Sequence, residues 1–339
     1  MKSNTVKKLL AAMCLTVIVA TTCALFVSCV DPKEVNMFEG IPNELEDSEV
    51  APDSVVAATA HVSVTDIVED ASMTTGQKIA AIMSATEQNE ITAERFNYFQ
   101  YKVGSTDLGS NHGTLIYQRL RKQNQECKDD TTFKLAVNHN FDAVAINFVQ
   151  DAMIRLVYDN KIYRIEGDVA NLDYDEDSGL VYMTDNTGWS KGKNFGDYES
   201  VSSSQNLDET KKTCANWSCE NIVSEENASI ERKTTDSGDA YYELTFSVDL
   251  TVANADPDTI SRLENDNGAS GMSLGKLEVR AEVWECGLMK FYETSETWTG
   301  RIVLYSGSAD THSYTWYSYT ERDNDMSGSV AILNTLLAD

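Results

Sequence analysis

The sequence predicts an α+β fold dominated by one antiparallel, curved β-sheet of the half-barrel type, with a few short helices. Three stretches carry this prediction. From Tyr242 to Val252, and again from Leu277 to Val283, apolar and polar residues alternate one by one. From Val144 to Tyr158 alternate positions are again apolar, and the chain then turns at Asp159-Asn160 into the strand-like run Lys161–Glu166. Alternation is typical of strands with one buried and one wet face, which favours an antiparallel sheet.

Three short helices are expected beside these strands. Thr74 can cap the first, because the apolar residues of 79–83 then fall on one helical face. Asp256-Pro257 can cap and start the second. Residues 330–337 have the amphipathic pattern of a closing helix.

Further aromatic and apolar runs complete the predicted sheet. A helix across residues 142–158 is an alternative to the strand there, since Val149 and Met153 also fit helical spacing. The hairpin that follows this stretch favours strands. The other predicted strands span residues 96–101, 115–120, 133–137, 180–183, 288–298, 301–305 and 314–319.

Residues 1–28 have the order of a bacterial signal peptide. Lys2, Lys7 and Lys8 give a basic start, and residues 9–27 carry no charge. A retained transmembrane helix is the alternative, because the apolar run is nearly long enough to cross a bilayer. No basic cluster follows the run, and the chain turns acidic at once. Cleavage is therefore the favoured interpretation.

The residues Leu-Phe-Val-Ser-Cys at 25–29 resemble a bacterial lipobox. This resemblance implies that Cys29 becomes the first residue of the mature protein and carries acyl chains such as palmitate. Several acyl chains hold a protein stably on a membrane. We therefore expect an extracytoplasmic, lipid-anchored protein, and leave open whether it lies on the inner membrane, the outer membrane or the cell surface.

Behind the anchor, residues 29–57 are expected to form an acidic flexible tether, since they contain three of the chain's four prolines. Residues 58–339 are expected to form a single sheet-rich domain, with a polar insertion at about 190–240. The formal net charge is −27, and all 54 acidic residues follow Cys29. Such a surface repels nucleic acid and anionic lipid, so neither is an expected partner.

Four cysteines follow Cys29 in the sequence, and an exported protein could pair them. Cys214 and Cys219 bracket a short loop and form the favoured disulfide. The alternative is that these two, together with Cys127 and Cys286, stay reduced as small buried residues.

No catalytic or metal site is expected. Residues 271–275 match the GxSxG pattern of serine hydrolases, but a polar loop precedes Ser273 and a strand follows, whereas the nucleophile elbow needs a strand and then a helix. A flexible loop is the better interpretation.

The carboxylates of 173–179 depart from a calcium loop in the position of the glycine and of the twelfth residue. The four histidines do not share zinc-ligand spacing. We therefore expect a protein that is not an enzyme and needs no cofactor.

The order of elements from about Thr74 to Tyr319 is an early helix followed by long meandering strands behind a lipidated cysteine. This order resembles the periplasmic lipoprotein carriers of the LolA type and the mycobacterial LppX-like lipoproteins. In those proteins a concave apolar sheet face holds acyl chains. The resemblance implies a lipid-anchored binding or structural protein with a lipid or other apolar small molecule on its concave face.

Two other functions are weighed against this one. Aromatic residues crowd the C-terminal strands, and Trp284, Trp298 and Trp316 could stack on sugars or contact a protein partner. A surface adhesin or carbohydrate-binding module is therefore the alternative, although such aromatics also serve as cross-strand packing in any sheet. A hydrolase that uses Ser273 ranks third.

Overall fold

The computed structural model describes most of the chain after residue 46. The described residues are 47–60, 63–108, 111–124, 129–139, 151–159, 161–175, 180–184, 189–193, 195–198, 223–267, 269–302, 305–322 and 326–338.

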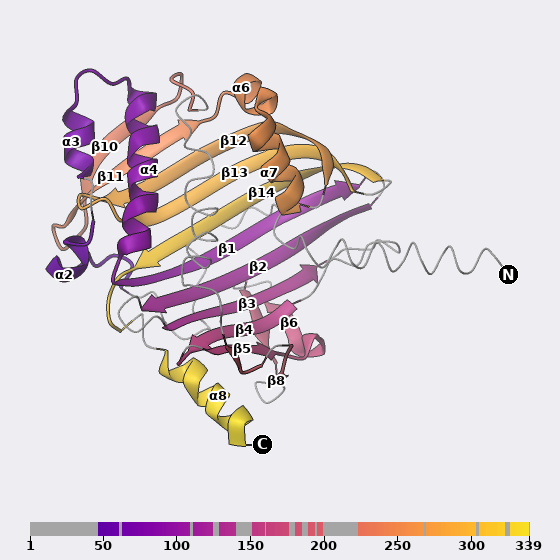
Figure 1. Ribbon diagram of the computed structural model, residues 1–339. Coiled ribbons are helices and arrows are strands. Elements are labelled where there is room, and N and C mark those ends of the chain that lie inside the picture. Colours follow the sequence, from indigo (N-terminus) through magenta and orange to yellow (C-terminus); the bar gives the residue numbers. More distant parts are fainter. Residues whose placement is uncertain are drawn as a thin grey trace.

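One twelve-stranded sheet forms the body of the protein (Figure 1). Its strand order is β10-β11-β12-β13-β14-β1-β2-β3-β4-β5-β8, with β9 also paired to β5, and every pairing is antiparallel. The predicted fold class is therefore confirmed. The strands of the sheet are β1 (Arg95–Leu108), β2 (Asn111–Asn124), β3 (Asp129–His139), β4 (Asp151–Tyr158), β5 (Lys161–Glu166), β8 (Ser190–Lys191), β9 (Asp197–Tyr198), β10 (Ser229–Thr234), β11 (Ala240–Ser247), β12 (Ser270–Trp284), β13 (Met289–Ile302) and β14 (Tyr305–Ser318).

A small two-stranded sheet and several helices complete the described structure. The small sheet pairs β6 (Leu172–Asp175) with β7 (Leu180–Met183). The helices are α2 (Ser54–Ala57), α3 (Val64–Glu69), α4 (Thr75–Thr92), the 3₁₀ turn η1 (Val169–Asn171), α6 (Leu250–Ala255), α7 (Pro257–Asn267) and α8 (Ser327–Ala338).

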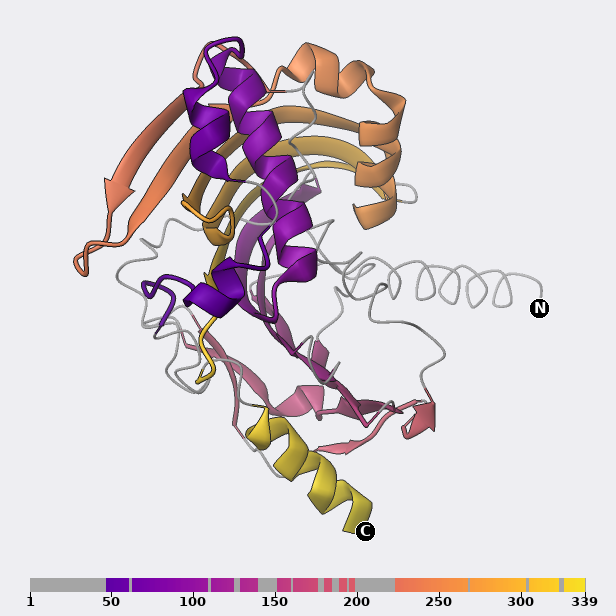
Figure 2. The ribbon, with the colours of Figure 1, turned by 60° about the vertical axis from the view of Figure 1, so that its left-hand side comes forward.

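The pairing of β14 with β1 joins the two halves of the sheet. Eleven residues of β1, from Asn97 to Asp107, lie opposite residues 318 to 308 of β14. One half of the sheet, β1 to β5, comes from the first part of the chain, and the other half, β10 to β14, comes from the last part. Figure 2 shows the joined sheet bent around the side that carries α4 and α7.

Other elements cover the two faces of the sheet over different sets of strands. We call the face packed by α2, α3, α4, α6 and α7 the helix face, and the opposite one the back face. Along β11 the side chains alternate between them, with Leu244 completely buried on the helix face and Thr245 exposed on the back. The largest apolar cluster lies on the helix face and runs from Val56 and Ile79 of the helices to Leu115 and Ala136 of β2 and β3.

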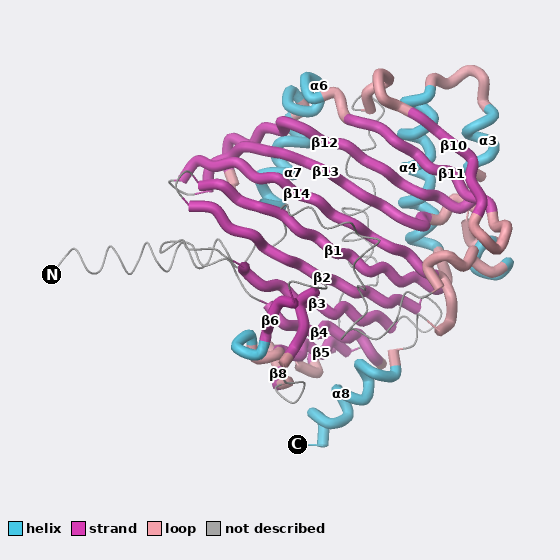
Figure 3. The backbone as a smooth tube through the Cα atoms, turned by 180° about the vertical axis from the view of Figure 1, so that it is seen from behind, coloured by secondary structure: helices cyan, strands magenta, loops and turns pink. Residues whose placement is uncertain are grey.

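The back face is covered by other elements at the other end of the sheet. There the β6–β7 hairpin covers Phe99, Ile116 and Leu135, with Val181 at the centre of the contact. Helix α8 packs Leu333 and Leu336 on the same face of β4 and β5. Figure 3, seen from behind, shows no helix over β10 to β14. The central strand β1 is therefore buried on both faces.

The predicted cap of the first helix is confirmed. The hydroxyl of Thr74 accepts the backbone N–H of Gln77, and the Gln77 side chain in turn accepts the N–H of Thr74. Glu225, just before β10, accepts the hydroxyl of Thr74 and the backbone N–H of Gly76. These hydrogen bonds lower the pKa of the Glu225 carboxyl, the Thr74 bond more than the Gly76 bond. Because Glu225 reaches α4 from the second half of the chain, the cap also fixes that helix to the sheet.

Several predicted boundaries are wrong. The alternating strand expected from Tyr242 to Val252 ends at Ser247, because the Asp249 side chain caps the new helix α6 by accepting the N–H groups of Thr251 and Val252. The boundary predicted between the strands 288–298 and 301–305 is also wrong, because β13 continues to Ile302 and the next strand, β14, begins only at Tyr305.

The GxSxG stretch is likewise not a loop. Residues 271–275 lie within β12, whose pairing with β13 shifts register twice across them, and Gly271 has a positive φ of 61°. The strand interpretation of residues 151–158 is confirmed, as is the hairpin to β5, with Asp159 at a φ of 50°. Residues 144–150 of that predicted strand lie outside the described residues.

The division into two faces gives a paired prediction. Leu244→Ala should lower the free energy of unfolding by about 3 kcal/mol, because it leaves a cavity in the helix-face core. Thr245→Ala, the next residue on the back face, should change it by less than about 0.5 kcal/mol. Urea denaturation followed by circular dichroism measures both, and equal effects would contradict the assignment of faces.

Candidate functional site

Polar side chains gather at the centre of the helix face, where a packed core would be apolar. We call this group the polar belt; it consists of Gln100 on β1, Thr294 and Glu296 on β13, and Thr311, Ser313 and Thr315 on β14. Register places all of them on the face that carries Tyr292 and Ala281. Figure 1 shows α4 over one end of β12 to β14 and α6 and α7 over the other.

The belt is deeply buried. Thr311 and Thr315 have no exposed surface, and the other three members on β13 and β14 are at most 8% exposed. Gln100 donates to the hydroxyl of Ser313 over 3.3 Å. The hydroxyl of Thr315, in contrast, has no hydrogen-bond partner in the described structure. Leaving a buried polar group unbonded costs about 1–3 kcal/mol, so this hydroxyl lowers the stability of the fold as it stands.

Two more buried donors on the helix face lie toward the α7 end of the strands. The indole N–H of Trp298 and the hydroxyl of Thr106 have no partner among the described residues. Both residues are at most 3% exposed. The helix face therefore combines apolar side chains with several buried hydrogen-bonding groups that have no partner among the described residues.

The helix face becomes basic beyond the belt. We call its cationic side chains on β1 to β5 the basic band, which comprises Lys102, Arg119, Arg121, Lys134, Arg155 and Arg164. Lys102 lies 3.7 Å from the carboxylate of Glu296 in the belt. Lys134 forms a 2.8 Å ion pair with Asp151 of β4. Belt and band are thus one continuous polar surface.

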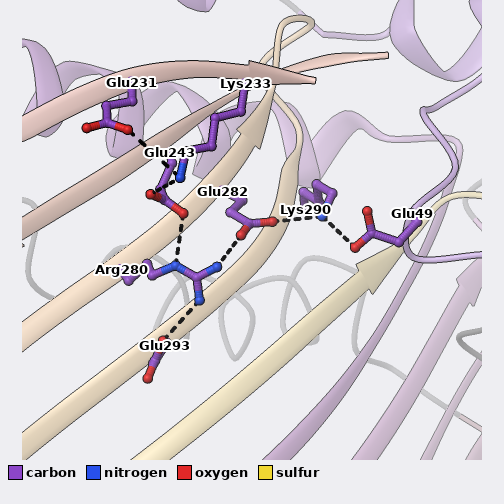
Figure 4. Close-up of polar contacts among 8 residues, drawn as sticks. All are labelled: Glu49, Glu231, Lys233, Glu243, Arg280, Glu282, Lys290 and Glu293. Carbon is purple, nitrogen blue, oxygen red and sulfur yellow. Dashed lines mark hydrogen bonds and ion pairs between the residues drawn. The ribbon is translucent and has the colours of Figure 1, made fainter. Parts of the chain in front are cut away.

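The back face of β10 to β13 carries a lattice of ion pairs, shown in Figure 4. Arg280 contacts Glu243, Glu282 and Glu293, and its guanidinium also lies 4.9 Å from the ring centre of Phe291. Lys233 pairs with Glu243. Each of these cations has more than one anionic neighbour, so every cation of the lattice is neutralised and the ion pairs link strands of the uncovered half of the sheet.

Lys290 forms the most buried part of this lattice. Its side chain is 4% exposed and pairs with Glu282 and Glu49, each over 2.7 Å. Burial lowers the pKa of Lys290, but the two carboxylates outweigh that effect and the pKa lies above its usual value. The ammonium also lies 4.9 Å from the ring centre of Tyr241 and 5.7 Å from that of Trp284. Lys290 is therefore a charged residue with a structural role at the edge of the hydrophobic core.

The chain before α2 is fixed to the body by the same kind of contact. Asp47 pairs with Arg322, Glu49 with Lys290, and Asp53 with Arg95. Backbone N–H groups of Val56 and Val55 and the charge of Arg95 lower the pKa of Asp53, against the opposing effect of burial. The end of the predicted tether, residues 47–57, is thus bound to the sheet.

The three predicted ligand-binding tryptophans lie in different places. Trp298 is on the helix face within the main core, and Trp284 is 2% exposed beneath Lys290 and Tyr241. Trp316 is half-buried on the back face, with its ring 5.3 Å from that of Phe291. The structure does not bring the three into one site.

The other predicted site residues are placed as follows. Cys29, Cys214 and Cys219 lie outside the described residues, as does residue 127, whereas Cys286 is a free thiol whose pKa is raised by burial. Ser273 lies 3.3 Å from the side-chain oxygen of Asn254. His312 contacts Ser295 and Tyr314 instead. The described contacts therefore give Ser273 and His312 no partner in common.

Among the described residues, no cluster of three or more His, Cys, Asp or Glu side chains has the arrangement needed to hold a metal ion. None of the helices in the described part of the chain combines the length and the apolar character needed to cross a membrane.

Comparison with known proteins yields only weak structural similarity. No protein-family model matches the chain, and no curated protein matches it. Among solved structures, the chain is similar to one titled "Lipid-protein interactions in lipovitellin", with a TM-score of 0.26 and 7% identity over 66% of this chain. The chain spans 25% of that protein's length. A similarity at this level does not establish a shared fold or function.

The polar belt was not found by sequence analysis. Its residues alternate with other polar residues, as in Thr294-Ser295-Glu296 and Thr311-His312-Ser313, so neither parity shows which face is buried. The Thr/Ser-rich pattern at the middle of two long adjacent strands was the available signal. Only the register of β13, β14 and β1 brings these residues together.

The ion lattice predicts a pH dependence of stability. Burial raises the pKa of Glu243, but hydrogen bonds from Lys233 and Arg280 outweigh it, so the pKa lies below its usual 4.5. The stabilisation by this carboxylate is therefore present above about pH 4.5 and is lost as the pH falls through the folded-state pKa. Glu243→Gln should lower the free energy of unfolding at pH 7 by about 1–3 kcal/mol and should weaken its decline at acidic pH.

Urea denaturation from pH 7 to pH 3 tests this prediction. The matched control is Glu231→Gln, because Glu231 is 65% exposed and lies 3.9 Å from Lys233. Identical pH profiles for the two variants would show that the lattice contributes no specific stability at Glu243.

Proposed function

We propose that this protein is a lipid-anchored, extracytoplasmic binding protein that holds a lipid-like small molecule on the helix face of its curved sheet. The polar belt is the observation that carries the proposal. A sheet that only had to fold around α4 and α7 would gain stability from apolar side chains at positions 311, 313 and 315. The five belt residues on β13 and β14 are nevertheless polar and at least nine-tenths buried, which supports a role in binding.

The surroundings of the belt fit an amphipathic ligand. Apolar residues of the helix face adjoin the belt, since Phe246 and Val279 lie in the same cross-strand row as Thr294, and Tyr292 lies two residues before it on β13. The hydroxyl of Thr315 and the indole N–H of Trp298 can bond polar groups of a bound molecule. A ligand with hydrocarbon and polar parts would therefore bury its apolar surface and pair these groups at the same time.

The anchor is the second part of the proposal. A lipid chain on Cys29 would hold the protein at a membrane, close to lipid molecules that it could bind. The ion pairs of Asp47, Glu49 and Asp53 fix the end of the tether to the sheet. The resemblance of the signal to a lipobox and of the element order to lipid-carrying lipoproteins supports the same function.

Removal of the unpaired hydroxyl tests the binding role. Thr315→Val keeps the size of the side chain and should leave stability unchanged or raise it, because a buried unbonded polar atom disappears. It should lower the amount of lipid that co-purifies with the full-length protein from its host membrane, measured by mass spectrometry of solvent extracts. Thr245→Val, on the exposed back face of β11, is the matched control.

Two results would contradict the binding role. One is the absence of any bound small molecule in the wild-type protein. The other is a Thr315→Val variant that loses several kcal/mol of stability, which would show that the hydroxyl has a structural bond.

Lipidation can be tested separately. Metabolic labelling with an alkyne palmitate analogue should mark the wild-type protein, and Cys29→Ser should abolish the label because the acceptor sulfur is gone. Cys23→Ser, which changes another cysteine of the signal, should keep the label. Label that persists in Cys29→Ser would exclude this anchor.

The carbohydrate-binding alternative now depends on Trp316. It is the one predicted tryptophan that is half-buried, and it lies on the part of the sheet where Figure 3 shows no helix. Glycan-array binding that disappears in Trp316→Ala would favour this alternative over a lipid-binding protein.

A further inference from the structure

Two buried hydrogen-bonding groups of the helix face lie in one row across the sheet. Register places Trp298 of β13 opposite Ala309 of β14, and Ala309 opposite Thr106 of β1. The indole N–H of Trp298 and the hydroxyl of Thr106 have no partner among the described residues, although both residues are at most 3% exposed. Native folds contain few such groups, so two in one row single out this part of the helix face.

The residues around this pair are small. Ala309 lies between the two groups, and Gly113 of β2 lies directly opposite Thr106. Gly104 and Gly300 follow at two residues' distance on the same face of β1 and β13. Glycine within a strand is typical of places where a ligand or another backbone comes close to the sheet.

The direction of the indole is set by its packing on Gly300. A Cβ atom at position 300 would lie 3.4 Å from Cζ3 of Trp298 and 2.5 Å from Sδ of Met272, so only glycine leaves room for the ring. In an indole, Cζ3 lies across the six-membered ring from the carbon that bears the nitrogen. The N–H of Trp298 is therefore on the side of the ring that faces away from Gly300.

The row that contains this pair has no charged side chain. Its members from β12 to β2 are Leu274, Trp298, Ala309, Thr106 and Gly113. The neighbouring row toward the belt contains one acid, Glu296, and Lys102 lies 3.7 Å from its carboxylate. Burying a charged ligand group in a row that offers it no counter-ion costs far more than burying a neutral polar group. The row therefore favours an uncharged head group.

The two unpaired groups also restrict the chemistry of that head. An indole N–H can only donate, whereas a threonine hydroxyl can donate or accept. The head must therefore offer an oxygen acceptor to Trp298, and an oxygen or a hydroxyl to Thr106. Since β14 separates the strands of the two residues, their axes are about 10 Å apart, a span that a head with several oxygens can cover.

We propose that the ligand of the helix face is an uncharged lipid of the acylglycerol kind, whose ester or hydroxyl oxygens bond the indole of Trp298 and the hydroxyl of Thr106. This inference rests on the proposed binding function and specifies the chemistry of the ligand and the place of its head. Binding would satisfy both unpaired groups without burying a charge.

The test compares two lipids with similar chains and different heads. Full-length protein in an uncharged detergent is equilibrated with equal concentrations of monoolein and oleyl sulfate, whose charge is permanent. The protein is recovered by affinity capture, and the retained lipids are extracted and measured by mass spectrometry. Wild-type protein should retain at least about tenfold more monoolein than oleyl sulfate. An excess of free glycerol should not displace monoolein, because glycerol lacks the hydrocarbon chain.

Two variants remove the proposed hydrogen bonds one at a time. Thr106→Val and Trp298→Phe should each lower the retained monoolein about fivefold, because each removes one neutral hydrogen bond. Neither should change the retained oleyl sulfate. Thr299→Val is the matched control, since Thr299 adjoins Trp298 on β13 but is exposed on the back face, and it should change neither lipid.

A spectroscopic readout locates the head directly. In protein with isotope-labelled indole nitrogens, the NMR signal that disappears in Trp298→Phe belongs to Trp298. Adding monoolein should shift this signal, because its N–H gains an acceptor, and should shift it less in Thr106→Val. A signal of Trp298 that does not respond to bound monoolein would overturn the inference.

A stability measurement guards against a structural role for the hydroxyl. Without added lipid, Thr106→Val should keep or raise the melting temperature, because a buried unbonded polar atom disappears. A fall of more than about 5 °C would show that the hydroxyl has a bond within the chain, which would also overturn the inference.

The outcomes separate this inference from the proposed function. If wild-type protein retains neither lipid, the lipid-binding function itself fails. If Thr315→Val lowers the bound lipid while Thr106→Val and Trp298→Phe do not, the protein binds lipids but the head lies elsewhere. Preference for oleyl sulfate would show that the site recognises a charge, and displacement of monoolein by free glycerol would show that the row binds a small polyol instead of a lipid.

Discussion

The pairing between β14 and β1 is the contact on which the rest of the structure depends. It joins strands that are about two hundred residues apart in the chain over eleven consecutive residue pairs, and it turns two separate meanders into one continuous sheet. Long-range pairing of this kind costs a large loss of chain entropy, which must be offset by favourable contacts once the strands have paired. Here the entropy loss is offset by burial of side chains on both faces of β1. Phe96 and Tyr98 lie in the helix-face core, and Phe99 and Tyr101 lie in the back-face core.

The two halves of the joined sheet are covered on opposite faces. The strands β10 to β14 bury the helix face beneath α2, α3, α4, α6 and α7, while β1 to β5 bury the back face beneath the β6–β7 hairpin and α8. Each half therefore leaves one polar face: the ion lattice around Arg280 on the back, and the basic band around Arg119 on the helix face. In the lattice, Glu243, Glu282 and Glu293 surround the guanidinium of Arg280. The band has ion pairs of its own, between Lys134 and Asp151 and between Lys102 and Glu296.

Burial of polar groups connects the fold to the proposed function. The polar belt occupies the junction between the two halves, where β13, β14 and β1 pair side by side. Its five members on β13 and β14 are at most 8% exposed, yet the hydroxyl of Thr315 has no partner in the described structure. In a protein whose purpose was only to fold, such a group would be a defect. In a binding protein the same group is an unmet hydrogen bond that a ligand supplies.

The sequence by itself determined the local features, because these depend on neighbouring residues. The alternation of 277–283, the Thr74 cap with Gln77, the Asp159 turn and the start of α7 at Pro257 all follow from contacts within a few positions. The end of β11 at Ser247 was not predicted, since the apolar alternation continues through Val252 while the Asp249 cap starts a helix. The site could not be predicted at all, because Gln100, Arg119 and Thr315 come from three strands and share a face only through register. Register is a property of the whole sheet, and only the tertiary structure decided it.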